Sequence, residues 1–132
     1  MQKIILSESH KKILKEHAKK EFPNESCALL FGTAGNTPNV KEVFLTENIE
    51  KSPINFTVSN EQLIEGYKTA EQKKMDVVGI FHSHPNSEAT PSNTDKKFME
   101  TNPVVWIIFS GVSEKFRAYF LDTEMKEIPI ES

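Results

Sequence analysis

Two short apolar runs constrain the fold of this chain more than any other feature. Residues 77–81 read VVGIF and residues 104–109 read VVWIIF, and both runs are the length of a strand and rich in β-branched residues. Because no polar residue alternates within them, both faces of these strands are expected to be buried. The sequence therefore predicts a central sheet that is covered by helices on both faces.

Three serines mark the starts of predicted helices, because each precedes residues at helical spacing: Ser7, Ser59 and Ser92. The first helix ends before Pro23, the second ends near Lys74, and Pro103 closes the third. Four residues of the second helix are expected to share one apolar face: Leu63, Ile64, Tyr67 and Ala70.

Three further segments are predicted as strands. Residues 27–31 (CALLF) form a short apolar run, residues 40–45 return along it, and residues 116–121 are expected to end the core. Helices and strands alternate early in the chain and two strands run together late, which indicates an α/β fold with a mixed β-sheet. A chain of 132 residues has the size of one domain, so we expect a single domain over residues 1–132.

Charge and hydropathy exclude several functional classes. The net charge of -3 gives no broad attraction to phosphate, so no nucleic-acid partner is expected. No apolar run approaches the length of a membrane span or of a signal-peptide core, so no membrane partner is expected either. Cys27 is the only cysteine and is expected to pack in the core; a chain without a disulfide fits a reducing compartment, so we expect a cytoplasmic location.

The segment that follows the first apolar run carries the chemistry. His82 and His84 follow the predicted strand 77–81 directly, and in extended backbone residues i and i+2 point to the same side. Asp95 supplies a third ligand, and two histidines with one acid are a usual catalytic zinc set. Three protein ligands leave one tetrahedral position for water, whose pKa zinc lowers to about 7.

Each part of this site also has a plain structural interpretation. Two histidines at the end of a strand can be solvated side chains without a metal. Ser92 and Asp95 form the pattern S-x-x-D, which resembles a capping box at the start of a helix. From spacing alone, both interpretations stay open.

The combination of these residues resembles the JAMM metalloprotease family, also called the catalytic MPN or JAB domain. Its hallmark is an upstream Glu, then H-[ST]-H-P, then a Ser and an Asp at fixed spacing, and this chain has Glu25, His82-Ser83-His84-Pro85, Ser92 and Asp95. The segments EFPNESCALLFG and INFTVSNEQLIEGYK are also similar to the family, except that Ala28 stands where many relatives carry Gly. The resemblance implies a cytidine-deaminase-like α-β-α sandwich.

The resemblance also implies a role for each motif residue. His82, His84 and Asp95 would bind one catalytic Zn²⁺ together with a water. Glu25 would be the general base, and Ser92 would donate to the developing oxyanion. For Glu25 to act, the strand it precedes and the strand that ends at the histidines must be neighbours with these ends together.

The implied activity is that of a zinc isopeptidase or peptidase that removes ubiquitin or a ubiquitin-like, sulfur-carrier-type modifier from lysines or C-terminal fusions. An extended modifier tail could add to an exposed sheet edge, such as residues 40–45. The short chain looks like a compact, stand-alone prokaryotic or archaeal-type member; its oligomeric state stays open. The alternative is a non-catalytic MPN-type scaffold, although such relatives usually lack the ligands. A nucleotide deaminase is disfavoured because the H-x-E and P-C-x-x-C pattern is missing.

Overall fold

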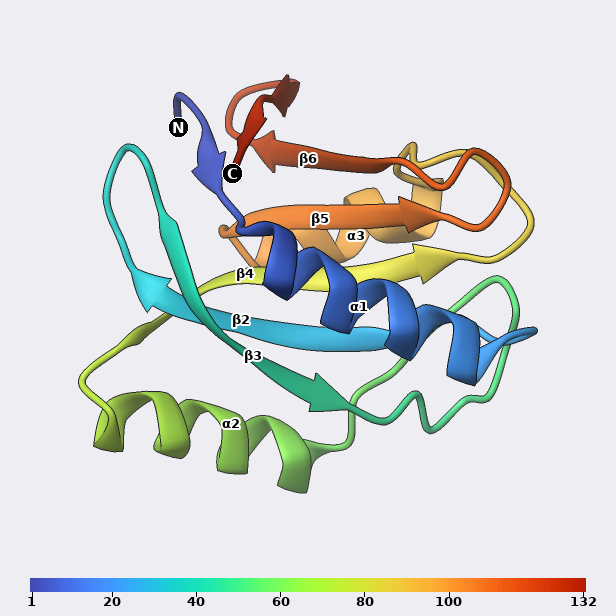
Figure 1. The fold of residues 1–132 in the computed structure, drawn as a ribbon, viewed down its shortest axis with the longest axis horizontal. Coiled ribbons are helices and arrows are strands. Elements are labelled where there is room, and N and C mark those ends of the chain that lie inside the picture. Colours follow the sequence, from blue (N-terminus) through green and yellow to red (C-terminus); the bar gives the residue numbers. More distant parts are fainter.

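The two apolar runs form neighbouring parallel strands, β4 (Asp76–His84) and β5 (Val105–Ser110), in a computed structural model that describes residues 1–132. Gly79 lies opposite Val105 and His84 lies opposite Ser110. These strands are almost wholly buried, as their composition predicts. They lie inside one mixed sheet of eight strands in the order β7-β6-β5-β4-β2-β3-β1-β8 (Figure 1).

The remaining elements include every other predicted helix and strand, together with three short strands near the chain ends that the sequence did not predict. The strands are β1 (Ile4–Ile5), β2 (Cys27–Thr33), β3 (Asn39–Thr46), β6 (Phe116–Leu121), β7 (Met125–Ile128) and β8 (Ile130–Glu131). The helices are α1 (Glu8–Glu21), α2 (Asn60–Gln72) and α3 (Asn93–Thr101). None of the helices is long and apolar enough to cross a membrane.

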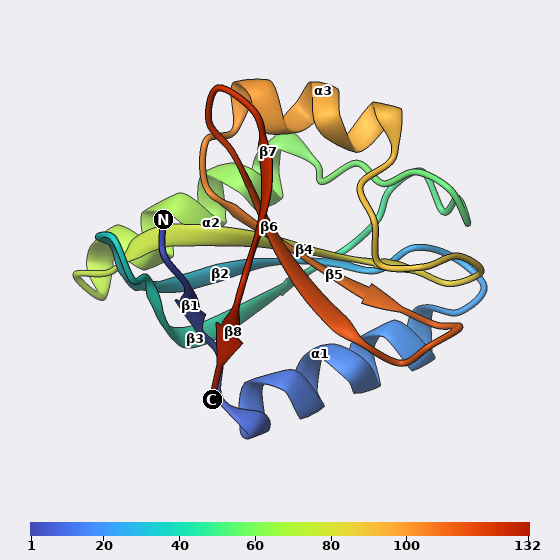
Figure 2. The same cartoon turned by 90° about the horizontal axis from the view of Figure 1, so that it is seen from above.

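Helices cover both faces of the sheet, which confirms the predicted α/β architecture. Helix α1 lies on one face, and α2 and α3 lie on the other (Figure 2). The core under α1 contains Leu14 together with Phe81 and Ile107, and the opposite core contains Met99 of α3 and Trp106. Alternate residues of β4 and β5 therefore enter different cores, as expected for central strands.

All three predicted serine caps are present. The Oγ of Ser7 accepts from the amide of His10, and the Oγ of Ser59 accepts from the amide of Gln62. Ser92 caps α3 in the same way. A serine hydroxyl at this position satisfies one of the free amides of the first turn.

The predicted apolar face of α2 is only partly the face that packs on the sheet. Ala70 is buried, but Ile64 is 68% exposed and Tyr67 is 52% exposed. The helix approaches the sheet at Gly66, where an added Cβ would lie 2.5 Å from the Cδ1 atom of Leu29. Close packing at Gly66 turns the small residues inward and leaves the two larger side chains outside.

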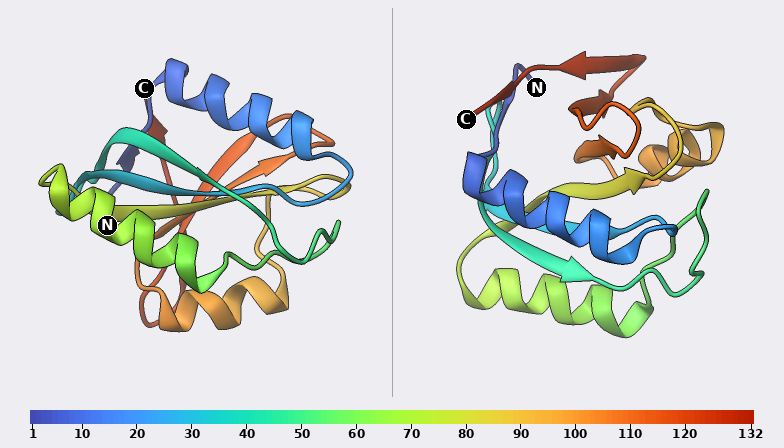
Figure 3. Two further views of the ribbon diagram at one scale, coloured as in Figure 1. Left: turned by 90° about the horizontal axis from the view of Figure 1, so that it is seen from below. Right: turned by 45° about the vertical axis from the view of Figure 1, so that its right-hand side comes forward.

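The prediction that residues 116–121 end the core is wrong, because two more strands follow. Strand β7 pairs with β6, whereas β8 pairs with β1 at the other edge of the sheet. Only Pro129 separates β7 from β8 along the chain, so the curled sheet brings its two edges together (Figure 3). These strands have four and two residues, too few for a clear periodic pattern.

Candidate metal centre

Strand β4 presents its two histidines on one side and Ser83 on the other, as predicted. The Oγ of Ser83 accepts from the amide of Ser26 at 2.8 Å and from the Ser26 hydroxyl at 2.9 Å. These bonds join the end of β4 to the residue just before β2. The alternation of the strand therefore directs His82 and His84 into a common site.

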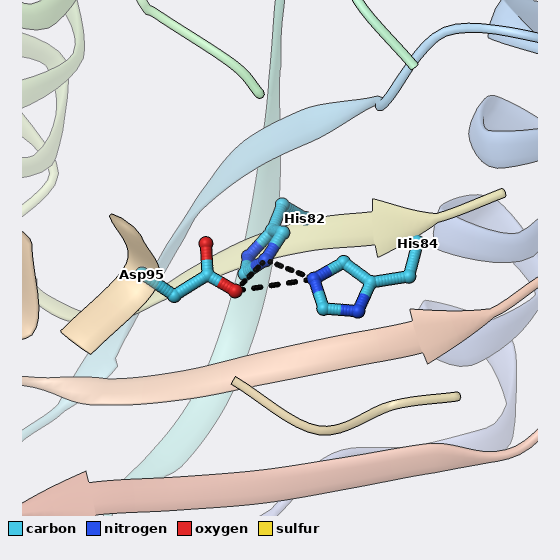
Figure 4. Close-up of side chains that lie close together, drawn as sticks. All are labelled: His82, His84 and Asp95. Atoms are coloured by element: carbon cyan, nitrogen blue, oxygen red, sulfur yellow. Dashed lines mark hydrogen bonds and ion pairs between the residues drawn. The ribbon is translucent and has the colours of Figure 1, made fainter. Parts of the chain in front are cut away.

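Three side-chain atoms that could bind a metal ion meet at the end of β4 (Figure 4). The Nε2 atoms of His82 and His84 are 3.0 Å apart, and each lies 3.1 Å from the Oδ2 atom of Asp95. All three side chains are buried. Bonds of about 2.0 Å to a tetrahedral zinc ion place ligand atoms about 3.3 Å apart, so this donor set and its spacing fit a zinc ion.

The orientation of His84 is fixed by the loop that follows it. Its Nδ1 atom lies 2.9 Å from the carbonyl oxygen of Glu88; donation to this carbonyl leaves the Nε2 lone pair facing the site. The neighbouring carbonyls are held too: Ser87 accepts from the Ser110 hydroxyl at 2.8 Å, and Ala89 accepts from the Tyr119 hydroxyl at 2.6 Å. Hydrogen bonds to three successive carbonyls therefore fix the conformation of this loop, and the loop in turn orients His84.

His82 is held by aromatic packing. The ring of Phe56 stacks on its imidazole with centroids 4.9 Å apart, and the indole of Trp106 meets it edge-on at 5.8 Å. Trp106 in turn donates from Nε1 to the carbonyl of Asn102 at 3.1 Å. The His82 side chain is fully buried, so its rotamer is set by packing before any metal binds.

Ser92 and Asp95 do form a capping box at the start of α3. The Asp95 amide donates to the Ser92 Oγ at 3.0 Å, and the Ser92 amide donates to Asp95 Oδ2 at 2.9 Å. The same Oδ2 atom faces the two histidines. The structural interpretation and the metal interpretation are therefore compatible, because the cap fixes the carboxylate and leaves the Ser92 hydroxyl proton free to donate.

Glu25 lies beside the histidines, because the antiparallel pairing of β2 with β4 brings the start of β2 to the end of β4. Its side chain is buried, and its Oε1 atom has no hydrogen-bond partner within the protein. Burial raises the pKa of Glu25 to about 8, an effect that His84 opposes and that Asp95 and Glu50 add to. The structure thus brings all five residues of the motif together.

The three ligand side chains polarise one another. Burial acts to raise the pKa of Asp95, but the close contacts of its carboxylate with His82 and His84 outweigh it and hold that pKa well below its usual range. Burial lowers the pKa of His82. Burial also acts to lower the pKa of His84, but Asp95, the Glu88 carbonyl and Glu25 together raise it overall. A divalent cation requires an ionised carboxylate and two neutral imidazoles, so Asp95 and His82 already favour the required forms and His84 would give up its proton to bind.

Sequence reasoning missed several residues that support the site. Phe56 stands only within a segment similar to the JAMM family, Tyr119 stands only within a predicted strand, and Asn48 lies in no predicted element. The similarity of INFTV to the JAMM family was the one signal that pointed toward Phe56. Asn48 belongs to no motif, and only its contacts reveal it.

The family model described as prokaryotic homologs of the JAB domain matches residues 7–122, which include every residue of the site. The chain belongs to this family. Membership confirms the resemblance drawn from the motif.

Two relatives and one solved structure illustrate how this JAB-domain protein compares with others. It is 33% identical over 102 residues to a desampylase of Pyrococcus furiosus, a match that covers 77% of this chain and 70% of the relative. It is 32% identical over 87 residues to a CysO-cysteine peptidase of Mycobacterium bovis. That match covers 66% of this chain and 58% of the peptidase, so it spans less than two thirds of that relative.

The crystal structure of a JAB1/MPN domain protein from Archaeoglobus fulgidus shares the fold. The two chains are 21% identical, the comparison covers 100% of both, and the TM-score is 0.59. The mixed sheet with helices on both faces is therefore the JAB/MPN architecture.

Proposed function

We propose that this protein is a zinc-dependent peptidase that cleaves ubiquitin-like modifiers from lysine side chains or from C-terminal fusions. The carrying observation is the convergence of His82, His84 and Asp95 beside a buried carboxylate, Glu25, that has no other partner. Bound there, Zn²⁺ would supply Lewis acidity toward a carbonyl oxygen and toward an attacking water. Side chains of this protein carry out the proton transfer and the stabilisation of the oxyanion.

Glu25 is the proposed general base. Its Oε1 atom is free to accept a proton from the water that attacks the scissile carbonyl, and the carboxyl can then return that proton to the leaving amine. A pKa of about 8, raised by burial, belongs to the metal-free site. A cation bound by the neighbouring ligands favours the ionised carboxylate, which brings Glu25 toward the protonation state of a base.

Ser92 is the proposed oxyanion donor. Its Oγ accepts from the Asp95 amide, so the oxygen is held in place while its proton remains available. A donor fixed in advance stabilises the charge that develops on a carbonyl oxygen; removing such a donor costs about 3 kcal/mol of barrier. The helix cap and the proposed catalytic donor are thus the same hydroxyl.

The relatives and the motif both support the proposed substrate class. The relatives are a desampylase and a CysO-cysteine peptidase, and the JAMM resemblance implies a ubiquitin-like, sulfur-carrier-type modifier. Both observations support hydrolysis at the C-terminus of such a modifier. We also propose a cytoplasmic location, since the single cysteine, Cys27, is buried and unpaired.

An open stretch of sheet edge supports recognition of an extended tail. Strand β1 pairs with β3 only at Asn39, so residues 40–45 have no strand neighbour on that side. Leu45 at the end of this edge is 43% exposed, and Ile49 in the next loop is 50% exposed. We propose that a modifier tail adds to β3 through backbone hydrogen bonds and directs its C-terminus toward the site.

The test is cleavage of a panel of ubiquitin-like fusions and isopeptide conjugates by the zinc-loaded protein. Wild type should cleave at least one substrate, Glu25→Gln should lose cleavage but keep its zinc, and His82→Ala should lose both. Glu16→Gln and His10→Ala, which change the same residue types on α1, are the matched controls and should match wild type. Cleavage that survives both site variants would refute the mechanism, and zinc-loaded wild type without any cleavage would favour the scaffold alternative.

A further inference from the structure

A buried asparagine organises the loop between β3 and α2. The side chain of Asn48 uses all of its hydrogen-bonding capacity. Its Nδ2 donates to the carbonyls of Glu25 and Asn55, each at 3.0 Å, and its Oδ1 accepts from the amides of Glu50 and Thr57, each at 3.1 Å. Asn48 is only 6% exposed, and its bond to the Glu25 carbonyl is buried.

These bonds close the loop on itself. Residues 49 and 57 meet where the Ile49 amide donates to the Thr57 carbonyl at 2.9 Å. Within the loop, the Ser52 hydroxyl accepts from the amides of Ile54 and Asn55 at 3.2 Å. Asn48 therefore lies inside a compact loop whose two ends are held together, a form typical of functional surface loops.

The loop is attached to Glu25 on both sides of that residue. The Glu25 amide donates to the Ser52 carbonyl at 2.8 Å, and the Glu25 carbonyl accepts from Asn48. The same loop carries Phe56, which stacks on His82. One loop thus contacts both the proposed base and the first metal ligand.

We propose that Asn48 is a positioning residue, which sets the loop over residues 48–57 and through it the backbone of Glu25. This proposal rests on the proposed function, in which Glu25 moves the proton. Asn48 touches neither the substrate nor the ligand atoms; it acts through Glu25. Asparagine suits this position because its amide group donates two hydrogen bonds and accepts two from one buried side chain.

The experiment compares Asn48→Ala, Asn48→Asp and Leu14→Ala in the zinc-loaded chain. Asn48→Asp keeps the shape and both acceptor bonds but loses the donors to Glu25 and Asn55, so it serves if Asn48→Ala does not fold. Leu14→Ala removes a fully buried side chain from the opposite core and controls for lost stability. On the best wild-type substrate, we expect both Asn48 variants to lower kcat by about 10- to 100-fold while KM changes by less than about threefold.

Residue-resolved hydrogen exchange gives a readout that does not depend on activity. Both Asn48 variants should accelerate exchange of the Glu25 amide while zinc content stays at the wild-type level, and Leu14→Ala should leave Glu25 exchange and kcat unchanged. Unchanged Glu25 exchange in the Asn48 variants would overturn the proposal, as would wild-type kcat despite faster exchange. If wild type cleaves nothing, the proposed function fails. The exchange rate of the Glu25 amide in the Asn48 variants still tests whether Asn48 holds the Glu25 backbone.

Discussion

Cys27 lies opposite His82 in the antiparallel pair of β2 and β4. The pairing continues toward the site, because the Ser83 amide donates to the Ser26 carbonyl at 3.0 Å. Glu25 precedes Cys27 by two residues and His84 follows His82 by two, so the register itself brings the proposed base to the second ligand. The distance between two motifs that are far apart in the sequence is thus set by one strand pair.

The buried carboxyl of Glu25 makes the stability of the metal-free protein depend on pH. Its folded-state pKa of about 8 exceeds the ordinary value of 4.5, so between these pH values the folded chain binds a proton that the unfolded chain has released. Stability is therefore lost as pH rises through this window. In EDTA-treated samples, the melting temperature of Glu25→Gln should increasingly exceed that of wild type from pH 4.5 to pH 8.5.

The comparison needs a control for the loss of one acid. Glu16→Gln on the exposed side of α1 should have the same melting temperature as wild type at each pH. A constant difference between Glu25→Gln and wild type across the window would contradict the raised pKa.

Ser92 has two separable roles. Ser92→Ala should lower the free energy of unfolding by about 1 kcal/mol through loss of the cap. Ser92→Gly should lower it by only a few tenths of about 1 kcal/mol. Both variants lack the hydroxyl and should lower kcat by about 100-fold. Denaturant unfolding and single-turnover cleavage measure the two effects, and a Ser92→Gly enzyme with wild-type kcat would assign Ser92 to the cap alone.

Tyr119 supports the loop that orients His84. Tyr119→Phe removes the donor to the Ala89 carbonyl and should lower the free energy of unfolding by about 1 kcal/mol. Zinc affinity should fall by no more than about 10-fold, because Tyr119 acts on the residue after the carbonyl that His84 uses. Chelator competition measures this fall. Tyr67→Phe, at an exposed position, is the matched control. Equal unfolding curves for the two variants would show that Tyr119 does not support the loop.

Asp95 should decide whether metal binding stabilises the fold. Adding Zn²⁺ to EDTA-treated wild type should raise the melting temperature; at free zinc about 100-fold above Kd the gain is about 2.7 kcal/mol. Asp95→Asn keeps an acceptor for the Ser92 amide but removes the anionic ligand, so the zinc-induced shift should largely vanish. Asp76→Asn, at the exposed start of β4, should shift like wild type.

Local chemistry made much of this molecule predictable. The runs at 77–81 and 104–109 have the length and the β-branched composition of central strands, and Ser7, Ser59 and Ser92 marked helix starts because a hydroxyl there has a local partner. The convergence of His82, His84 and Asp95 was predictable because strand alternation and a helix cap are both short-range rules.

Features that depend on packing between residues far apart in the sequence were not predictable. The outward turn of Ile64 depends on how closely Gly66 approaches Leu29, and the residues that meet there are far apart in the sequence. Asn48 is an ordinary loop residue in the sequence, and its four bonds reach as far as Glu25. The short strand β8 depends on β1, a neighbour from the opposite end of the chain.

The closing of the sheet has a kinetic consequence. Ile4 pairs with Ile130, so this contact spans almost the whole chain and requires the largest loop to close. Such long-range pairs slow folding and form after local hairpins. The pairing of β5, β6 and β7 along neighbouring segments can form early, and the chain then acquires its last strand pair only when both ends meet.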